Sequence, residues 1–361
     1  MNDRAARAAS PVNVAEFEAL AAERIEAGPL GYFAGGAGDE RTLRRNVSAF
    51  AEWELIPRVL VDVSEVDASV ELFGSTLSMP LAVAPVAFQR LVHPYGEEAM
   101  ALGAGGAGTA MCLSTIATAT PATVAGAAPG TVRWFQLYCF RDRAVTEALV
   151  AEAVQSGYRA ILLTVDAPYA GRRERDLRAG FRVDVDAPSV QAAIGSDRPV
   201  TVEEVFDLVD PSLDWDSLAA LTAGCELPVV LKGVLSPDDA ELAIEAGAAG
   251  LVVSNHGGRQ LDGVPASIDA LPAVADAVAG RVPVLMDGGV RRGTDALVAL
   301  ALGADAVLVG RPALWGLAVD GEQGARRVLE LLKAEIELAL ALLGCPTPAD
   351  VTRAHVARRG R

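Results

Sequence analysis

The stretch Gly250-Leu251-Val252-Val253 runs directly into Ser254-Asn255-His256-Gly257-Gly258-Arg259-Gln260-Leu261-Asp262. Its four leading residues are typical of a buried strand, and the glycines that follow indicate a loop. The loop places an imidazole and a guanidinium three residues apart. An imidazole can take up a proton near neutral pH, and a guanidinium can bind a carboxylate through two parallel hydrogen bonds. His256 and Arg259 therefore predict a site that binds a small acid and removes a proton from it.

Short apolar runs like this one occur eight times along the 361 residues. They are Leu81–Ala84, Ala110–Leu113, Val132–Leu137, Ala160–Val165, Val229–Lys232, Gly250–Ser254, Val284–Asp287 and Ala306–Val309. Successive runs end 22 to 33 residues apart, with one exception, which leaves room for one strand and one alanine-rich helix each time. Because strands buried on both faces are apolar throughout, the pattern predicts an α/β fold consisting of a single (β/α)8 TIM barrel.

The exception is the 67-residue interval between Val165 and Lys232. One helix and its loops need about half of that length. The part from 181 to 215 is rich in Asp, Pro, Val and Ser and has no sustained period. Such a long loop after the fourth strand of a barrel predicts an active-site lid or a mobile segment.

Residues 1–80 precede the first apolar run and are predicted to form an N-terminal helical extension that packs on the barrel of residues 81–361. Within this extension, Val14–Ala27 has helical character, which Gly28-Pro29-Leu30-Gly31 is expected to end. Near the other end of the chain, Ala325–Leu343 predicts one long amphipathic helix that stops at Gly344.

The composition excludes several classes of partner. Lys and Arg number 31 against 47 Asp and Glu, a formal net charge of −16. Nucleic acids and anionic membrane surfaces select basic faces, so neither is expected to bind. No apolar run approaches the ~18 residues that span a bilayer, and no secretory signal is expected from the first residues. Four cysteines without C-x-x-C spacing and the absence of a His or Cys ligand pattern predict a cytoplasmic protein without a metal site.

Polar and ionisable side chains gather directly after the apolar runs, at the end where (β/α)8 barrels place their active sites. They are Gln136 and Tyr138 in the third unit, Thr164 and Asp166 in the fourth, Lys232 in the fifth, Ser254, His256 and Arg259 in the sixth, and Asp287 in the seventh. After the last two runs, Gly288-Gly289 precedes Arg291, and Gly310 precedes Arg311. Glycines let backbone N–H groups approach an anion, so these loops predict a phosphate site; the alternative is tight turns with solvated arginines.

Lys232 and Asp166 each allow more than one role. A lysine at the end of a buried strand needs a negative partner, so a structural ion pair with Asp166 or Asp287 and a Schiff-base role are alternatives. Beside a phosphate-bearing cofactor, we favour a Lys232 that stabilises negative charge developing on the cofactor. Asp166 is the natural residue to orient His256, and its alternative is to cap the turn that it begins.

The motif Ser254-Asn255-His256-Gly257-Gly258-Arg259-Gln260-Leu261-Asp262 resembles a specific signature of the FMN-dependent α-hydroxy acid oxidase and dehydrogenase family, which includes glycolate, lactate and mandelate or hydroxymandelate oxidases. The resemblance extends from about Val14 to His355. Further matches are Gly31-Tyr32-Phe33-Ala34, Gln136-Leu137-Tyr138, Thr164-Val165-Asp166, Leu231-Lys232-Gly233, and the run from Asp287 to Asp295 followed by Gly310-Arg311-Pro312.

The resemblance implies FMN at the mouth of the barrel and a role for each matching residue. The cofactor would contact Pro85, Val86, Ala87, Ser114, Gln136, Thr164, Lys232, Ser254, Asp287, Gly288, Gly289, Arg291, Gly310 and Arg311. The substrate would contact Tyr32, Ile116, Tyr138, Tyr169, Arg173 and Arg259. Catalysis would fall to His256 with Asp166, assisted by Tyr138 and Lys232.

The implied reaction is oxidation of an (S)-2-hydroxy acid to the 2-oxo acid, with O2 as the acceptor and peroxide as the product. Glycolate oxidases carry a Trp where this chain has Ile116, and Phe88 and Tyr169 are expected to add aromatic walls. These features favour a mandelate-type aryl substrate, with L-lactate or another aliphatic acid as the alternative. A dehydrogenase with a different acceptor is the alternative within the family, and tetramers or octamers are implied. An unrelated phosphate-binding barrel and a non-catalytic flavin protein are the alternatives outside it.

Overall fold

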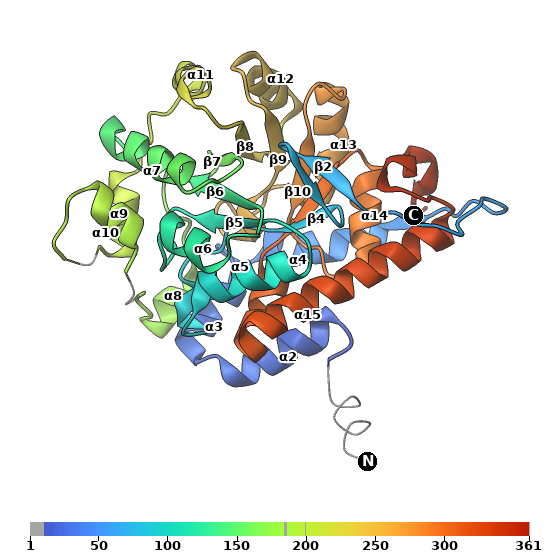
Figure 1. The fold of residues 1–361 in the computed structure, drawn as a ribbon, viewed down its shortest axis with the longest axis horizontal. Helices are drawn as coiled ribbons and strands as arrows, with labels where there is room; N and C mark the ends of the chain where they lie inside the picture. Colours follow the sequence, from blue (N-terminus) through green and yellow to red (C-terminus); the bar gives the residue numbers. More distant parts are fainter. Residues whose placement is uncertain (1–10, 184–185, 199, 361) are drawn as a thin grey trace.

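Eight parallel strands close into a barrel in the computed structural model, which describes residues 11–183, 186–198 and 200–360 (Figure 1). The strands are β4 (Leu81–Val83), β5 (Met111–Ser114), β6 (Arg133–Leu137), β7 (Ile161–Thr164), β8 (Val229–Val234), β9 (Gly250–Val253), β10 (Val284–Asp287) and β11 (Ala306–Val309). They follow one another around the barrel in chain order, and β11 pairs with β4 to close it. The predicted barrel is therefore confirmed, with every strand within two residues of its expected bounds.

One helix of the outer ring follows each strand (Figure 1). These helices are α5 (Gly96–Gly106), α6 (Pro121–Ala127), α7 (Arg143–Gln155), α11 (Trp215–Gly224), α12 (Pro237–Glu245), α13 (Ser267–Val278), α14 (Gly293–Ala301) and α15 (Arg311–Leu343). Helix α15 is longer than the predicted 325–343, and it is interrupted by non-helical backbone at Asp320 and Gly321. It ends where expected, at Gly344, whose φ of +77° suits a glycine.

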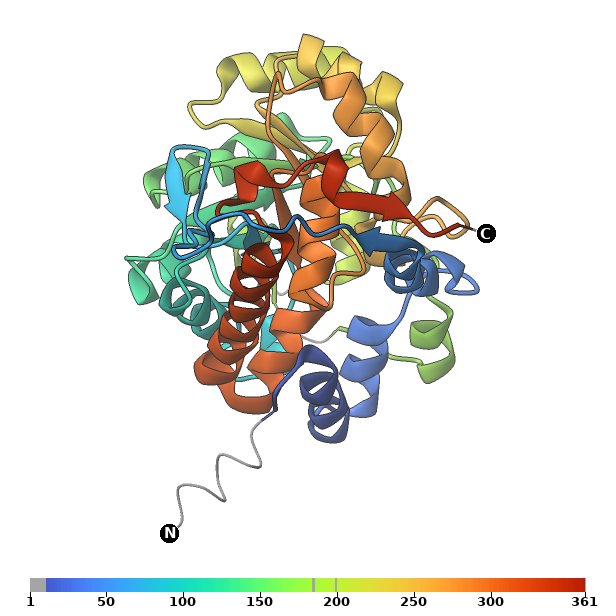
Figure 2. The same ribbon diagram turned by 90° about the vertical axis from the view of Figure 1, so that its right-hand side faces the viewer.

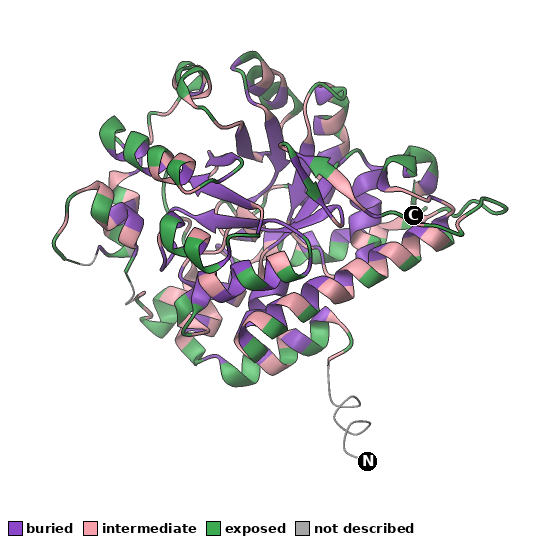
Figure 3. Ribbon diagram, in the orientation of Figure 1, coloured by how far each residue is buried: buried purple, intermediate pink, exposed green. Residues whose placement is uncertain are grey.

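The barrel interior is apolar at one end and polar at the other. The residues of the barrel strands are almost all buried, as the purple ribbon in Figure 3 shows, which explains their largely apolar sequence. A hairpin of β2 (Val70–Leu72) and β3 (Ser75–Leu77) adds Phe73 to the inner cluster, where its ring packs edge-on against Trp134 at 5.5 Å. The polar side chains of the barrel that could bind a ligand therefore lie mainly at the carboxyl ends of the strands.

The extension before β4 contains α2 (Val14–Arg24), α3 (Ala27–Ala34) and α4 (Arg41–Ser48). The helix predicted over 14–27 ends early, because Ile25 adopts an extended conformation with ψ of 135°. Gly28-Pro29-Leu30-Gly31 lies inside α3 and does not break a helix, contrary to expectation. Pro29 is tolerated because it occupies the first turn, where a backbone N–H has no intrahelical partner.

The extension is joined to the rest of the chain in several places. Helix α2 packs along α15, and β1 (Trp53–Leu55) pairs with β12 (Val356–Arg358), as Figure 2 shows. Short 3-10 turns complete the described chain: η1 (Ala49–Glu52), η2 (Gln89–Leu91), η3 (His256–Gly258), η4 (Pro348–Asp350) and η5 (Arg353–His355). No helix within the described ranges has both the length and the hydropathy needed to span a lipid bilayer.

The long connection between β7 and α11 contains three short helices, although its sequence shows no period. They are α8 (Glu174–Ala179), α9 (Pro188–Ala193) and α10 (Val202–Leu208). Helix α10 begins with a capping box in which Thr201 and Glu204 exchange hydrogen bonds, and α9 packs on α7. Helices of six or seven residues are too short to give a readable period, which is why the sequence predicted only a loop.

Candidate active site

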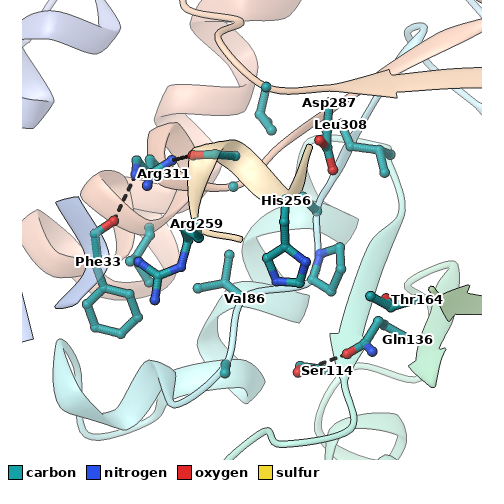
Figure 4. A pocket seen from close by; sticks show the side chains of 18 of the residues that line it. Phe33, Val86, Ser114, Gln136, Thr164, His256, Arg259, Asp287, Leu308 and Arg311 are labelled. Atoms are coloured by element: carbon teal, nitrogen blue, oxygen red, sulfur yellow. Dashed lines mark hydrogen bonds between the residues drawn. The ribbon is translucent and has the colours of Figure 1, made fainter. Parts of the chain in front are cut away.

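A pocket opens at the carboxyl ends of the strands and collects most of the predicted site residues (Figure 4). The predicted residues that line it are Tyr32, Pro85, Val86, Ala87, Ser114, Ile116, Gln136, Tyr138, Thr164, Arg173, Lys232, His256, Arg259, Asp287, Gly288, Gly289, Arg291, Gly310 and Arg311. Asp166 and Ser254 stand behind this lining and contact it through hydrogen bonds. The polar groups after separate strands therefore converge on one cavity.

The imidazole and carboxylate predicted to act together are in contact. Nδ1 of His256 lies 2.9 Å from Oδ1 of Asp166. Burial opposes ionisation of Asp166, but the neighbouring His256 and Lys232 outweigh burial and hold the pKa of this carboxyl below its ordinary value. An ionised Asp166 fixes a proton on Nδ1, so Nε2 is left as the basic nitrogen.

Lys232 makes the ion pair that was one of its predicted alternatives. Its Nζ lies 2.9 Å from Oδ2 of Asp287 and donates to Oγ of Ser254 at 2.8 Å, and Ser254 donates in turn to Asp287 at 2.6 Å. Burial alone would lower the pKa of Lys232, but Asp287 and Asp166 raise it. The pocket therefore contains a buried ammonium group whose charged form is favoured by its carboxylate partners.

Strand β8 carries a bulge that lets Asp166 approach. The register with β9 shifts between Lys232 and Val234, and Gly233 has a φ of +114°. A Cβ at Gly233 would lie 2.7 Å from Cβ of Asp166, closer than side chains tolerate. Only glycine fits there, and the base partner and the lysine are thus placed side by side.

Two guanidinium groups lie close to the ring of Tyr32. Cζ of Arg259 lies 4.7 Å from the ring centroid, and Cζ of Arg173 lies 5.5 Å from it. Arg259 also donates to the backbone carbonyls of Tyr32 and Gly35, while Arg173 pairs with Asp176. Burial, together with the charge of Arg173, lowers the pKa of Arg259. A pocket with clustered cations of this kind is suited to an anionic ligand.

The loop after β10, one of the two predicted from sequence to bind phosphate, turns through left-handed glycines, with φ of +97° at Gly288 and +90° at Gly289, whereas Gly310 after β11 has a φ of −97°. Arg291 and Arg311 line the pocket and do not extend into bulk solvent. Arg311 donates to the carbonyls of Phe33, Gly257 and Gly35, two of them drawn in Figure 4. Burial and the nearby Arg259 and Arg291 lower its pKa to about 9. An anion placed here would relieve that repulsion.

A buried donor without a partner also indicates a ligand. Gln136 is 2% exposed, and its Oε1 accepts hydrogen bonds from Oγ of Ser114 and the amide of Thr115. Its Nε2 has no partner among the described residues. An unsatisfied buried amide costs about 1–3 kcal/mol, so this group is suited to donate to an acceptor that enters the pocket.

Two predicted aromatic walls are not where the sequence suggested. Tyr169 is 70% exposed and does not line the pocket. Gln260 explains this, because its Nε2 donates to the carbonyls of Asp166 and Tyr169 and fixes the loop with the Tyr169 side chain outside. Phe88 is buried behind Tyr32, at a ring distance of 6.3 Å, and contributes to the pocket only by supporting that ring.

The segment between β7 and α11 brings a residue that the sequence did not predict. Phe206 of α10 lines the pocket, with its ring centroid 5.7 Å from that of Tyr138. Phe181 of the same segment lies 6.1 Å from the ring of Tyr32. No local signal marks these residues, because their positions depend on how the short helices fold back over the barrel.

Known proteins resemble this chain over almost its whole length. A family model described as FMN-dependent dehydrogenase matches residues 21–358. Glycolate oxidase 1 of Oryza sativa is 45% identical over 351 residues, and L-lactate oxidase of a Nostoc species is 46% identical over 353 residues, with at least 95% of each chain covered. A solved structure of mandelate oxidase with (S)-4-hydroxymandelic acid superposes with a TM-score of 0.89 at 41% identity, covering 96% of this chain and 98% of the other. The chain belongs to the FMN-dependent dehydrogenase family, and FMN is its cofactor.

Proposed function

We propose that this protein oxidises an (S)-2-hydroxy acid to the corresponding 2-oxo acid. The observation that carries the proposal is the meeting of an imidazole–carboxylate pair and a carboxylate-binding guanidinium in one pocket. A phosphate-binding barrel with another activity would explain the loops around Gly289 and Gly310. It would not explain why His256 and Arg259 share the pocket. The related glycolate, lactate and mandelate oxidases support the same reaction class.

The residues present fit FMN. Arg291, Arg311, Gly289 and Gly310 would hold its phosphate, and Asp287 would lie at the ribityl chain. Its ring would contact Ser114, Gln136, Thr164 and the backbone of 85–87, and Nε2 of Gln136, which has no partner in the described part of the chain, would gain an acceptor. Lys232 would supply positive charge to the ring, with Ser254 holding its ammonium group. When bound, FMN accepts the two electrons that the substrate loses.

The side chains of the chain itself then bind the acid and move its proton. Arg259 and Tyr32 hold the substrate carboxylate, and Arg173 adds a second guanidinium from the side of the long connection. Burial and the nearby Asp166 raise the pKa of Tyr138, so its hydroxyl stays protonated and can donate to the substrate. His256 takes up the proton at Nε2. The hydroxyl proton and the α-carbon proton are alternatives, and both need the same base and the same clamp.

We favour an aryl substrate of the mandelate type and O2 as the acceptor, with release of peroxide. Ile116 leaves space where a tryptophan would be larger, and Phe206 provides an apolar aromatic surface over the pocket. Apolar contacts of this kind discriminate by about 1–3 kcal/mol per group. L-lactate or another aliphatic acid is the alternative substrate, and a different electron acceptor is the alternative to O2.

Flavin absorption tests the proposal directly. The purified protein is made anaerobic, and (S)-mandelate, L-lactate and glycolate are added in separate titrations. We expect (S)-mandelate to bleach the yellow colour at the lowest concentration, and the colour to return when air is admitted. Bleaching by lactate alone would assign an aliphatic acid as the substrate in place of an aryl acid. Slow recolouring in air would indicate an electron acceptor other than O2. A yellow protein that none of the three bleaches would contradict the proposal.

Replacing Gln136 by Glu is expected to weaken FMN binding about tenfold, because one hydrogen-bond donor is lost while the acceptor oxygen is kept. The dissociation constant is measured by titrating apoprotein with FMN. Gln323→Glu on the exposed face of α15 makes the same change of charge away from the pocket and serves as the control. An unchanged dissociation constant for Gln136→Glu would show that this donor does not bind the cofactor.

A further inference from the structure

The backbone that carries His256 is held in an unusual conformation. His256, Gly257 and Gly258 have φ of +57°, +63° and +75°, three left-handed residues in succession. The two glycines adopt this conformation freely, but for a histidine it costs free energy. Such a conformation persists at a functional site only when neighbouring groups hold it.

The contact that holds this turn comes from a distant part of the chain. Oδ1 of Asn255 accepts a hydrogen bond from the amide of Gly258 at 3.1 Å, within the turn. The same Asn255 forms a reciprocal amide pair with Asn46 of α4, in which each Nδ2 donates to the other Oδ1 at 2.8 and 2.7 Å. Asn46 is 1% exposed and Asn255 is 4% exposed. Two buried amides bonded in both directions have a single geometry, so Asn46 fixes the orientation of Asn255, together with the carbonyl of Pro265, which accepts from Nδ2 of Asn255 at 3.0 Å.

Helix α4 also packs tightly against the backbone of the loops that follow the neighbouring strands β9 and β10. A Cβ at Gly258 would lie 2.6 Å from the amide nitrogen of Leu43. A Cβ at Gly289, in the loop assigned to the phosphate, would lie 1.9 Å from the carbonyl oxygen of Asn46. The amide of Ala37 donates to the carbonyl of Gly258 at 2.9 Å. The glycines of these loops therefore make room for the extension as well as for a ligand.

We propose that Asn46 is a positioning residue that acts through Asn255 to hold the left-handed turn and thereby aims His256 at the substrate. Arg259, four residues after Asn255, is anchored separately by the ring of Tyr32 and the carbonyls of Tyr32 and Gly35. Loss of the amide pair therefore disturbs the base more than the carboxylate clamp. The catalytic consequence rests on the proposed function, whereas the effect on the turn does not.

The kinetic signature follows from this separation. Asn46→Ala is expected to lower kcat by about 10- to 100-fold, the usual effect of removing a residue that orients a site group, with less than about a threefold change in KM. Asn255→Ala is expected to act similarly, and the double variant should be no more than about threefold worse than Asn255→Ala alone. If the loss of kcat in the double variant equals the product of the two single losses, Asn46 acts independently of Asn255, and the proposal is overturned.

Hydrogen exchange of the holoenzyme gives a readout that needs no substrate. We expect Asn46→Ala to speed exchange in the peptide 254–263 about tenfold, because the turn loses the support that protects its amides. Arg45→Ala is the matched control: it lies on the same helix, pairs with Glu52 and with Asp269 of α13, and leaves the amide pair intact. If Asn46→Ala does not fold, Asn46→Asp, which keeps the acceptor for Asn255, is measured instead with a smaller increase expected.

The outcomes separate the two proposals. Faster exchange in 254–263 for the Asn46 variant but not for Arg45→Ala supports the role of Asn46 in holding the turn, even if the wild-type protein oxidises no hydroxy acid. Unchanged exchange in that peptide, or equal increases in both variants, overturns it. If the exchange results support the role of Asn46 but no hydroxy acid reduces the flavin of the wild-type enzyme, only the proposed function is contradicted.

Discussion

Replacing His256 by Ala is expected to leave a yellow protein whose turnover is lowered by about 10²–10⁴-fold, the range contributed by a positioned general base. The imidazole is not among the groups assigned to the phosphate or the flavin ring, so FMN should remain bound. Arg259 keeps its own anchors, so the substrate should still bind. The loss is therefore expected in kcat, with a much smaller change in the dissociation constant of the acid.

Anaerobic reduction of the flavin in a single turnover measures this prediction without interference from the reoxidation step. His93→Ala is the control, since His93 lies outside the pocket lining and accepts a hydrogen bond from the amide of Tyr95. A variant at His256 that reduces its flavin within tenfold of the wild-type rate would remove it from the role of base. Asp166→Asn should share the phenotype, because an amide can present its NH2 group to Nδ1 and favour the wrong tautomer.

The barrel and the core of the site could be predicted because their signals are local. Strands buried on both faces must be apolar along their whole length, and this marked all eight of them in the sequence. Side chains that follow parallel strands lie at one end of the barrel, so Asp166, Lys232 and His256 could be grouped although up to 90 residues separate them. The resemblance then supplied the cofactor.

What could not be predicted depends on contacts between distant segments. Phe206 reaches the pocket through a short helix without a readable period, and Tyr169 faces outward because Gln260 binds its carbonyl. Asn46 lies 209 residues from the Asn255 that it pairs with, and nothing in its neighbourhood marks it. The helix break was misplaced for a related reason: Pro29 is compatible with the first turn of α3, and the chain bends before it.

Replacing Arg259 by Met is expected to lower kcat/KM by about 10²–10³-fold, mainly through a higher KM for the acid. A buried charge pair that loses one partner costs about 2–5 kcal/mol, because the remaining charge stays desolvated. Arg173, whose Cζ lies 5.5 Å from the ring centroid of Tyr32, retains one guanidinium and limits the loss. Met keeps much of the apolar stem of arginine, so packing against Tyr32 changes less than charge does.

Arg259→Lys distinguishes charge from geometry in this prediction. An ammonium keeps the charge but cannot form two parallel hydrogen bonds or stack on the ring of Tyr32, so the lysine variant should recover only part of the lost affinity. Guanidine added to Arg259→Met should restore some turnover if the pocket has kept its shape. Because Arg259 also binds the carbonyls of Tyr32 and Gly35, retained flavin absorption must accompany the kinetic loss. A KM close to that of the wild type in Arg259→Met would assign the carboxylate to Arg173 instead, with Arg259 left to hold the extension against the barrel.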